Sequence, residues 1–175
     1  MRTRDLAQAA LLVAVAMILR SLTPPLIMGM KPDLTLTMMF IIFIIKRDIK
    51  LGFLVALTTG IFTALTTTFP GGQIPNIIDK LLTFALVYNL VPVITKFASK
   101  RIAAGLTTAV GTAISGSIFL GAATLLVGLP APFSVLFTSV VLPTAALNTA
   151  AAVVIFSVVD FAMDINYNSP ENEAA

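Results

Sequence analysis

The sequence predicts an all-α membrane protein whose helices cross the bilayer several times and pack into one bundle. Of the 175 residues, 58% are hydrophobic and only 11% carry a charge, and the mean hydropathy is +1.01. A soluble domain of this length needs a larger share of charged residues for its surface, typically about 25%. The charges also lie between long apolar runs, so we predict six membrane-spanning helices.

Three apolar segments occupy the first part of the chain. The first runs from about residue 6 to 22 and stops at Pro24–Pro25, because proline cannot continue a helix. The second, about 33–45, is shorter than the roughly 20 residues of a comfortable span, so it crosses only with flanking residues or a thinned bilayer. The third, about 51–69, is ended by Pro70–Gly72.

Three more segments follow. The fourth, about 77–97, begins after Pro75. The fifth and sixth share the charge-free run 102–159, which Gly128–Pro132 divides. Pro143 frees a backbone carbonyl in the sixth segment and is expected to bend that helix, which suits the wall of a cavity.

The charge distribution predicts an orientation. With the N-terminus in the cytoplasm, eight of the 11 Lys and Arg residues fall in cytoplasmic parts of the chain: Arg2, Arg4, Lys46, Arg47, Lys50, Lys96, Lys100 and Arg101. The opposite face keeps Arg20, Lys31 and Lys80, so the positive-inside rule places both termini in the cytoplasm. This bias accounts for the net charge of +3 without a nucleic-acid partner. Residues 1–165 are predicted to form one membrane domain, and 166–175 a polar, acidic tail.

Small residues recur at every fourth position in two places. The longer row, in the fifth segment, is Gly105, Ala109, Ala113, Ser117 and Gly121, and the shorter one, in the first segment, is Ala10 and Ala14. Small residues at this spacing let two helices approach closely where no hydrophobic effect drives them together. We favour packing inside the bundle as the interpretation of the longer row.

The residues that most enzymes use are scarce. The chain lacks Cys, His and Trp, and it has no phosphate-binding loop, metalloprotease motif, nucleophile elbow or paired carboxylates within a span. A serine or threonine nucleophile would have no activating base. We therefore predict no enzymatic activity, no ATP hydrolysis by the chain itself, and neither a cofactor nor a metal site.

The connection between the third and fourth segments, residues 66–80, is the predicted functional centre. Its unusual residues are Phe69, Gly71, Gly72, Gln73, Asn76, Asp79 and Lys80. A plain hairpin between membrane helices needs only a few turn residues, so this connection is longer and more polar than its connecting role requires. On the same side lie Arg20, Lys31, Asp33 and, deeper in the bilayer, Asn148.

These residues suit a zwitterion such as an amino acid. Its ammonium group needs an anion, for which Asp79 and Asp33 are the candidates. Its carboxylate needs donors, for which the candidates are Lys31, Lys80, Arg20 and the backbone N–H groups of Gly71 and Gly72. The first turn of the fourth helix adds further donors aimed at an anion.

Each of these residues also has a purely structural interpretation. Asp79–Lys80 fits a first-turn acid followed by a lysine that extends to the membrane surface, and Asp33 fits an N-cap. Arg20 can extend to lipid head groups, and Asn148 can bond to a neighbouring helix. For Asp79 we favour a role in binding, because ionisable residues close to the membrane are energetically costly and tend to mark sites.

The run from Leu65 to Lys80, LTTTFPGGQIPNIIDK, resembles the signature of the bacterial tryptophan transport protein family, TrpP. Thr23–Pro25, Gly29–Asp33 and Met38–Phe40 resemble the first loop and second helix of that family. The family is similar in size and span count to the substrate-binding S components of energy-coupling factor (ECF) transporters. In those, six helices bind a small molecule, while a T subunit and two cytoplasmic ATPases drive transport.

The resemblance implies an S-component-like bundle in the bacterial cell membrane that binds an aromatic amino acid, with L-tryptophan as the expected ligand. It implies a T subunit and two ATPases as partners, besides membrane lipid, and contacts of Ala10 and Ala14 with the T subunit. The expected substrate contacts are Lys31, Asp33, Phe69, Gly71, Gly72, Gln73, Asn76, Asp79, Lys80 and Asn148. Met28 and Met30 are further candidates for contact with the indole ring. The first outward loop, residues 21–32, is expected to close over the bound ligand.

Two alternatives stand beside this hypothesis. The first is a stand-alone permease driven by a proton or sodium gradient, with Asp79 as the coupling acid. The second is a structural membrane protein that transports nothing and associates through the row of small residues from Gly105 to Gly121.

Overall fold

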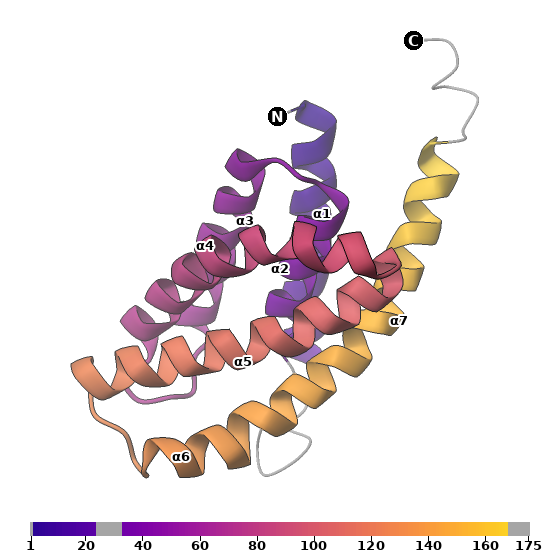
Figure 1. Cartoon of the computed structure of the whole chain (residues 1–175). Helices are drawn as coiled ribbons and strands as arrows, with labels where there is room; N and C mark the ends of the chain where they lie inside the picture. The colour runs from indigo at the N-terminus through magenta and orange to yellow at the C-terminus, as the bar shows by residue number, and fades with distance from the viewer. Residues whose placement is uncertain (1, 24–32, 168–175) are drawn as a thin grey trace.

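The computed structural model describes residues 2–23 and 33–167, and every regular element within them is helical (Figure 1). The helices are α1 (Thr3–Leu22), α2 (Leu34–Ile45), α3 (Ile49–Leu65), α4 (Gln73–Phe97), α5 (Lys100–Leu126), α6 (Phe133–Leu136) and α7 (Leu142–Tyr167). A π-helical turn, η1 (Phe137–Val141), joins α6 to α7 without a break. The described chain therefore forms six helical rods, which confirms the predicted all-α fold.

Four of these rods are long and apolar enough to cross a membrane. They are α1, α4, α5 and the rod formed by α6, η1 and α7, whose apolar part is Phe133–Ala162. Helices α2 and α3 are apolar as well but shorter. The predicted polytopic membrane protein is confirmed. The last helix continues to Tyr167, slightly past the predicted end of the domain at residue 165.

Helix α2 lies at the centre of the bundle, and this position explains its short length. Every residue from Leu34 to Ile44 is buried, and α2 contacts α1, α3, α4, α5 and α7. A helix that is hydrophobic on all sides belongs in the interior of a protein. Its 12 residues extend about 18 Å, against roughly 30 Å for the hydrocarbon core. Because protein surrounds α2, it does not need to match the thickness of the lipid.

The turn between α3 and α4 differs from the prediction at both helix ends. Helix α3 ends at Leu65 rather than Phe69, and α4 begins at Gln73 rather than after Pro75. Gly71 has a φ of 71°, a left-handed conformation that favours glycine, and it turns the chain before α4. Pro75 fits into the first turn of α4 because the N–H group that proline lacks would have no helical partner there.

The bend expected at Pro143 stays a prediction, but the π-helical turn η1 ends two residues before this proline. Such turns occur mostly as single-turn bulges within α-helices, frequently at functional sites. Gly116 on α5 lies against this turn, and a Cβ atom at Gly116 would collide with the side chain of Val141. The absence of a side chain at Gly116 thus lets α5 and η1 pack closely.

The longer row of small residues packs against the bundle at its beginning. A Cβ atom added at Gly105 would lie 3.2 Å from Val153 on α7, whereas one added at Gly121 would have no atom within 4 Å. Another glycine of α5, Gly111, packs against the buried ring of Phe40 on α2. Close helix packing on α5 therefore depends on Gly105, Gly111 and Gly116 more than on a single row.

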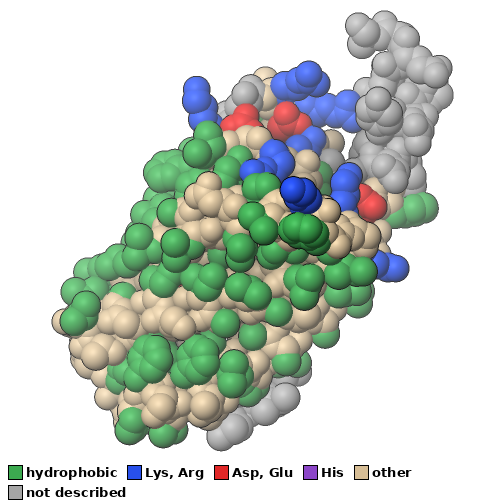
Figure 2. All heavy atoms as spheres, viewed as in Figure 1, with side chains coloured by type: hydrophobic (Ala, Val, Ile, Leu, Met, Phe, Trp, Pro, Cys, Tyr) green, Lys and Arg blue, Asp and Glu red, His purple; other side chains and the backbone are tan. Residues whose placement is uncertain are grey.

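Lys and Arg side chains gather at one end of the molecule, around the start of α1 and the connection between α4 and α5 (Figures 1 and 2). At this end the Lys46 ammonium pairs with the Asp5 carboxylate at 2.5 Å, which ties α2 to α1. The Asp48 carboxylate accepts hydrogen bonds from the backbone N–H groups of Lys50 and Leu51 and thereby caps α3. The segregation of charge that the sequence predicts is thus present in the folded chain.

Candidate ligand-binding site

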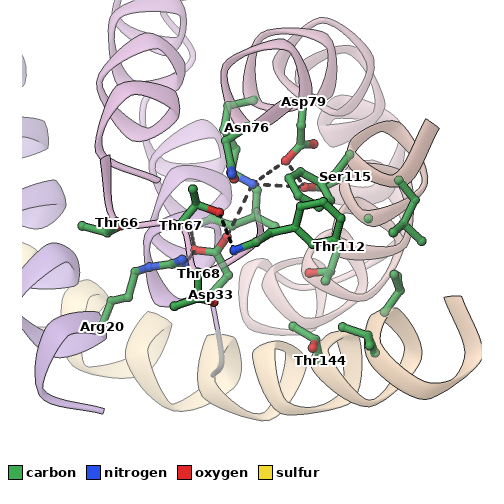
Figure 3. Close-up of a pocket in the computed structure, with 18 of the residues that line it drawn as sticks. Arg20, Asp33, Thr66, Thr67, Thr68, Asn76, Asp79, Thr112, Ser115 and Thr144 are labelled. Carbon is green, nitrogen blue, oxygen red and sulfur yellow. Dashed lines mark hydrogen bonds and ion pairs between the residues drawn. The ribbon is translucent and has the colours of Figure 1, made fainter. Parts of the chain in front are cut away.

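A cavity of about 430 Å³ lies at the end of the bundle opposite the basic connections (Figure 3). The last turns of α1 and α3 and the first turns of α2 and α4 contribute to its lining, together with the second half of α5 and the rod of α6, η1 and α7. This volume falls in the range of about 300–1,000 Å³ that is usual for sites that bind small molecules.

The lining combines charged and hydroxyl groups with a large apolar surface. Its polar members are Arg20, Ser21, Asp33, Thr66, Thr67, Thr68, Asn76, Asp79, Lys80, Thr112, Ser115 and Thr144. Its larger apolar members are Leu36, Phe62, Phe69, Phe119, Leu120, Leu136, Val140 and Val141. A few polar groups set in a mostly apolar pocket are what fix the orientation of a bound small molecule.

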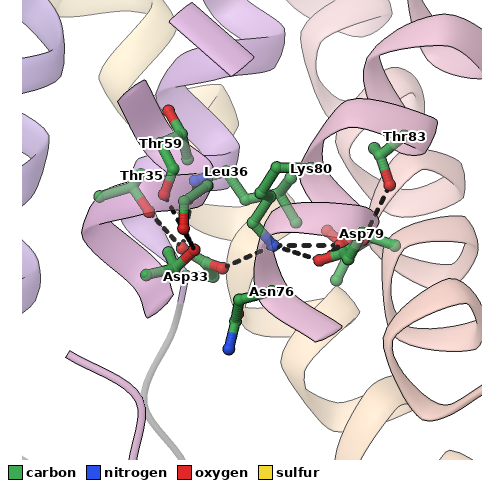
Figure 4. Close-up of polar contacts among 12 residues, drawn as sticks. Asp33, Thr35, Leu36, Thr59, Asn76, Asp79, Lys80 and Thr83 are labelled. Carbon is green, nitrogen blue, oxygen red and sulfur yellow. Dashed lines mark hydrogen bonds and ion pairs between the residues drawn. The ribbon is translucent and has the colours of Figure 1, made fainter. Parts of the chain in front are cut away.

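Four charged side chains form a row of alternating sign along this cavity. Figure 3 shows Arg20 beside Asp33, and Figure 4 shows Asp33, Lys80 and Asp79. Arg20 Nη1 lies 2.7 Å from Asp33 Oδ1, and Asp33 Oδ2 lies 3.4 Å from Lys80 Nζ. Lys80 Nζ in turn lies 2.6 Å from Asp79 Oδ2. We refer to these four residues as the charge row. It joins the end of α1, the start of α2 and the first turns of α4.

Asp33 lies between Arg20 and Lys80 in the row, and several hydrogen bonds hold it in place. Its Oδ1 atom accepts hydrogen bonds from the backbone N–H of Leu36 at 3.1 Å and from the hydroxyl of Thr35 at 2.6 Å. The N-cap role considered from the sequence is therefore confirmed. The backbone N–H of Asp33 donates to Asn148 Oδ1 at 2.7 Å, so α7 holds the start of α2 in place.

Asp79 and Lys80 form the buried end of the row. The Asp79 carboxylate accepts hydrogen bonds from Thr83 at 2.9 Å and from Ser115 at 2.9 Å, besides the pair with Lys80. Their side chains are 1% and 3% exposed, respectively. Lys80 therefore points into the bundle and does not extend to the membrane surface. An ion pair buried this deeply needs these additional hydrogen bonds to offset its desolvation.

Two amides support the site. Asn76 lines the cavity, and its Nδ2 group donates to the backbone carbonyl of Gly72 at 2.7 Å. Asn148 is fully buried and does not line the cavity. Besides accepting from Asp33, it donates from Nδ2 to the hydroxyl of Thr112 at 3.3 Å. Asn148 thus connects α2, α5 and α7, as the structural interpretation of this residue predicted.

An aromatic pair lines the cavity. The rings of Phe69, in the α3–α4 turn, and Phe119, on α5, meet edge to face with centroids 5.3 Å apart and an angle of 86°. Phe62, one turn before the end of α3, lines the cavity as well. Rings arranged in this way favour a further aromatic group packed against them, since edge-to-face and offset-stacked pairs are both stabilising.

Of the predicted contact residues, the structure brings five to this cavity: Asp33, Phe69, Asn76, Asp79 and Lys80. Gly71, Gly72, Gln73 and Asn148 do not line it. Gly71 and Gly72 form the turn before α4, and Gln73 is exposed in its first turn. Lys31, Met28 and Met30 lie outside the described residues. The assignment of these residues to ligand binding stays a prediction.

Helix α5 supplies four lining residues that were not predicted from the sequence: Thr112, Ser115, Gly116 and Phe119. These positions follow the spacing of one helix face, i, i+3, i+4 and i+7. The sequence could have indicated this contribution, because hydroxyl groups lie on one face of α5 within the charge-free run 102–159. The row of small residues from Gly105 to Gly121 lies on a neighbouring face of α5. Because that row predicted helix packing, no binding role was assigned to this helix.

The arrangement fits a small molecule that carries both positive and negative charges and an apolar body. The charge row offers partners of both signs, and the phenylalanines offer a surface for a ring. Among the described residues, no group of three or more His, Cys, Asp and Glu side chains is placed to hold a metal ion.

Comparison with known proteins gives a consistent result. A family model described as the tryptophan transporter TrpP matches residues 2–164. A probable tryptophan transport protein of Clostridium acetobutylicum is 42% identical over 165 residues, which cover 94% of this chain and 96% of the relative. One of Bacillus subtilis is 43% identical over 159 residues, which cover 91% of this chain and 92% of the relative. No solved structure matches the chain.

The family is one of transporters, in agreement with the predicted absence of enzymatic activity. Its match extends over nearly all of the described helices, and the multiple apolar helices fit a multi-pass membrane protein. The resemblance found at residues 65–80 therefore extends over residues 2–164. The chain belongs to the tryptophan transporter family TrpP.

Proposed function

We propose that the chain binds L-tryptophan in the 430 Å³ cavity and acts as the substrate-binding component of an ATP-driven, ECF-type importer. The observation that carries this proposal is the charge row beside the aromatic pair of Phe69 and Phe119. An amino acid with an indole ring has a charged end of both signs and a flat apolar end. The relatives are named as probable tryptophan transport proteins.

The distribution of charge supports an outward-facing cavity. Lys and Arg side chains gather at one end of the molecule (Figure 2), whereas the cavity is lined by the last turns of α1 and α3 and the first turns of α2 and α4, at the opposite end. By the positive-inside rule, that basic end faces the cytoplasm. The cavity then opens toward the outer side of the membrane, where an importer takes up its substrate.

The exposed face of α1 supports a partner in the membrane. Ala9, Val13 and Ala16 of this helix are buried against the bundle, whereas Ala10 and Ala14 are exposed. Small exposed residues four positions apart let a second helix approach closely. The chain carries no nucleotide-binding motif of its own, so a T subunit docked on this face, with two ATPases, would supply the energy.

Binding is tested with the ligand's own fluorescence, because the chain contains no Trp residue. L-tryptophan titrated into the detergent-purified protein should show a blue-shifted emission as its indole ring enters the apolar cavity. The shift should saturate at one ligand per chain and be reversed by an excess of a non-fluorescent competitor. Emission that stays at the position of free tryptophan at all protein concentrations would contradict the proposal.

Coupling is tested by uptake of labelled tryptophan into proteoliposomes. The proposal predicts uptake only when the T subunit and the two ATPases are co-reconstituted with the chain and ATP is supplied. Uptake by the chain alone under a proton or sodium gradient would instead support the stand-alone permease. Absence of both binding and uptake would support a structural role.

A further inference from the structure

We infer that the cavity selects ligands that carry both an ammonium and a carboxylate group and no net charge, with the carboxylate on Arg20 and the ammonium on Asp33. This inference rests on the proposed function, because it specifies which groups of an indole-containing ligand are recognised. It goes beyond that function by excluding close relatives of tryptophan that have lost either charged group.

The charges of the described lining are balanced. Among the described residues, the charged side chains that line the cavity are Arg20, Asp33, Asp79 and Lys80, two of each sign, so their charges cancel. They are already paired with one another. A ligand of net charge would add an uncompensated charge beside the buried pair of Lys80 and Asp79, which is unfavourable. A zwitterion adds one charge of each sign and keeps the balance.

The four side chains of the charge row differ in their capacity to bind a new partner. The Asp79 carboxylate is 1% exposed and already holds Lys80, Ser115 and Thr83, and the Lys80 side chain is 3% exposed. The side chains of Arg20 and Asp33 are 20% and 17% exposed. A ligand therefore reaches Arg20 and Asp33, whereas the pair of Lys80 and Asp79 acts as a fixed counter-charge behind them.

The Arg20–Asp33 pair has room for both charged groups of a ligand. Asp33 Oδ1 is occupied by Arg20, Thr35 and Leu36, while Oδ2 has Lys80, at 3.4 Å, as its partner among the described residues. Asp33 Oδ2 is thus the oxygen with room for an ammonium donor. A guanidinium carries five N–H donors, of which the 2.7 Å contact with Asp33 engages Nη1. An α-amino acid can lie along this pair so that its carboxylate meets Arg20 and its ammonium meets Asp33.

The test compares L-tryptophan with tryptamine, which lacks the carboxylate and is a cation, and with indole-3-propionate, which lacks the ammonium and is an anion. All three have indole fluorescence, so binding to the Trp-free wild-type protein is measured in the same way. We expect both analogues to bind at least about 100-fold more weakly than tryptophan, because each lacks one of the two groups that contact Arg20 and Asp33 and brings a net charge into the site.

Variants that change the charge of the cavity should change which of the two analogues binds more tightly. Arg20→Met leaves the cavity with one net negative charge, so tryptophan should weaken and tryptamine should become the better ligand of the two analogues by roughly tenfold or more. Asp33→Asn leaves one net positive charge and should favour indole-3-propionate instead. Arg20→Lys should keep the wild-type order. Arg101→Met, which removes an exposed arginine on α5 far from the cavity, is the matched control and should change nothing.

The outcomes separate the two proposals. If the wild-type protein binds no tryptophan, the proposed function fails. If it binds tryptophan but binds tryptamine or indole-3-propionate equally well, the inference fails while the function stands. The wild-type panel gives this result even if a variant does not fold. Variants that fold but keep the wild-type order of analogues would also overturn the inference.

Discussion

The Arg20 guanidinium lies 2.7 Å from the Asp33 carboxylate and joins the last turn of α1 to the start of α2 at the cavity. At the other end of the same two helices, Lys46 pairs with Asp5 at 2.5 Å. Only the first of these pairs lines the cavity. The two ion pairs both join α1 to α2 but have different surroundings. The Lys46–Asp5 pair can therefore serve as a control for substitutions in the Arg20–Asp33 pair.

Asn148→Leu should weaken tryptophan binding although Asn148 does not line the cavity. The substitution leaves the backbone N–H of Asp33 without its acceptor at 2.7 Å, which costs about 1–3 kcal/mol and lets Asp33 shift. We expect roughly a tenfold loss of affinity and a lower unfolding temperature. Asn89→Leu is the matched control, because Asn89 is exposed on α4 and bonds only within its helix. Equal effects of the two substitutions would contradict a positioning role for Asn148.

Phe119→Ala should weaken binding of the indole ring while the protein stays folded. The edge-to-face pair with Phe69 would lose one partner, and such ring contacts contribute about 0.5–1.5 kcal/mol beyond the buried area. The double variant with Phe69→Ala should lose less affinity than the two single effects combined, since the rings touch. Phe97→Ala, at the exposed end of α4, should retain wild-type affinity. Fluorescence titration measures all four variants.

Gly116→Ala should lower both stability and affinity, because its Cβ would collide with Val141 in the cavity wall. Overpacking of this kind typically costs about 1–3 kcal/mol. Gly121→Ala on the same helix meets no atom within 4 Å and should be neutral or stabilising by up to about 1 kcal/mol. Adding Val141→Ala to Gly116→Ala should restore stability. Thermal unfolding distinguishes these cases, and failure of that rescue would place the cause elsewhere.

Leucine at both Ala10 and Ala14 should abolish ATP-driven uptake and leave tryptophan binding unchanged. Both alanines are exposed on α1, so larger side chains would block close approach of a partner helix without disturbing the bundle. Ala146 and Ala150 on α7 are also exposed and also four positions apart, so leucine at these two positions is the control. If both double variants transport normally, the partner does not dock on this face of α1.

The fold was largely predictable from the sequence because the bilayer imposes a length on each apolar run. The helix order followed from that constraint, and so did the segregation of charge. Features that do not depend on the thickness of the bilayer follow from helix packing and local backbone chemistry instead. Helix α2 is short because other helices surround it, and Pro75 lies inside α4 because a first turn tolerates it.

The site was predictable where the sequence is unusual and unpredictable where it is ordinary. The unusual residues of the stretch 66–80 stood out, and of these Phe69, Asn76, Asp79 and Lys80 line the cavity. Ser115 and Phe119 are common residues of an apolar helix, and only the rotation of α5 brings them there. The inward direction of Lys80 likewise depends on Asp33 arriving from α2, a contact that the sequence order does not reveal.

The most direct test of the central claim is the affinity for L-tryptophan of Asp33→Asn compared with Asp48→Asn. Both aspartates cap the start of a helix through their carboxylates, but only Asp33 lines the cavity. If the charge row binds the ligand, Asp33→Asn should lose roughly 10- to 100-fold in affinity, as expected for a charged hydrogen bond of about 1.5–3 kcal/mol, and Asp48→Asn should bind like the wild type. Equal affinities of the two folded variants would contradict the claim.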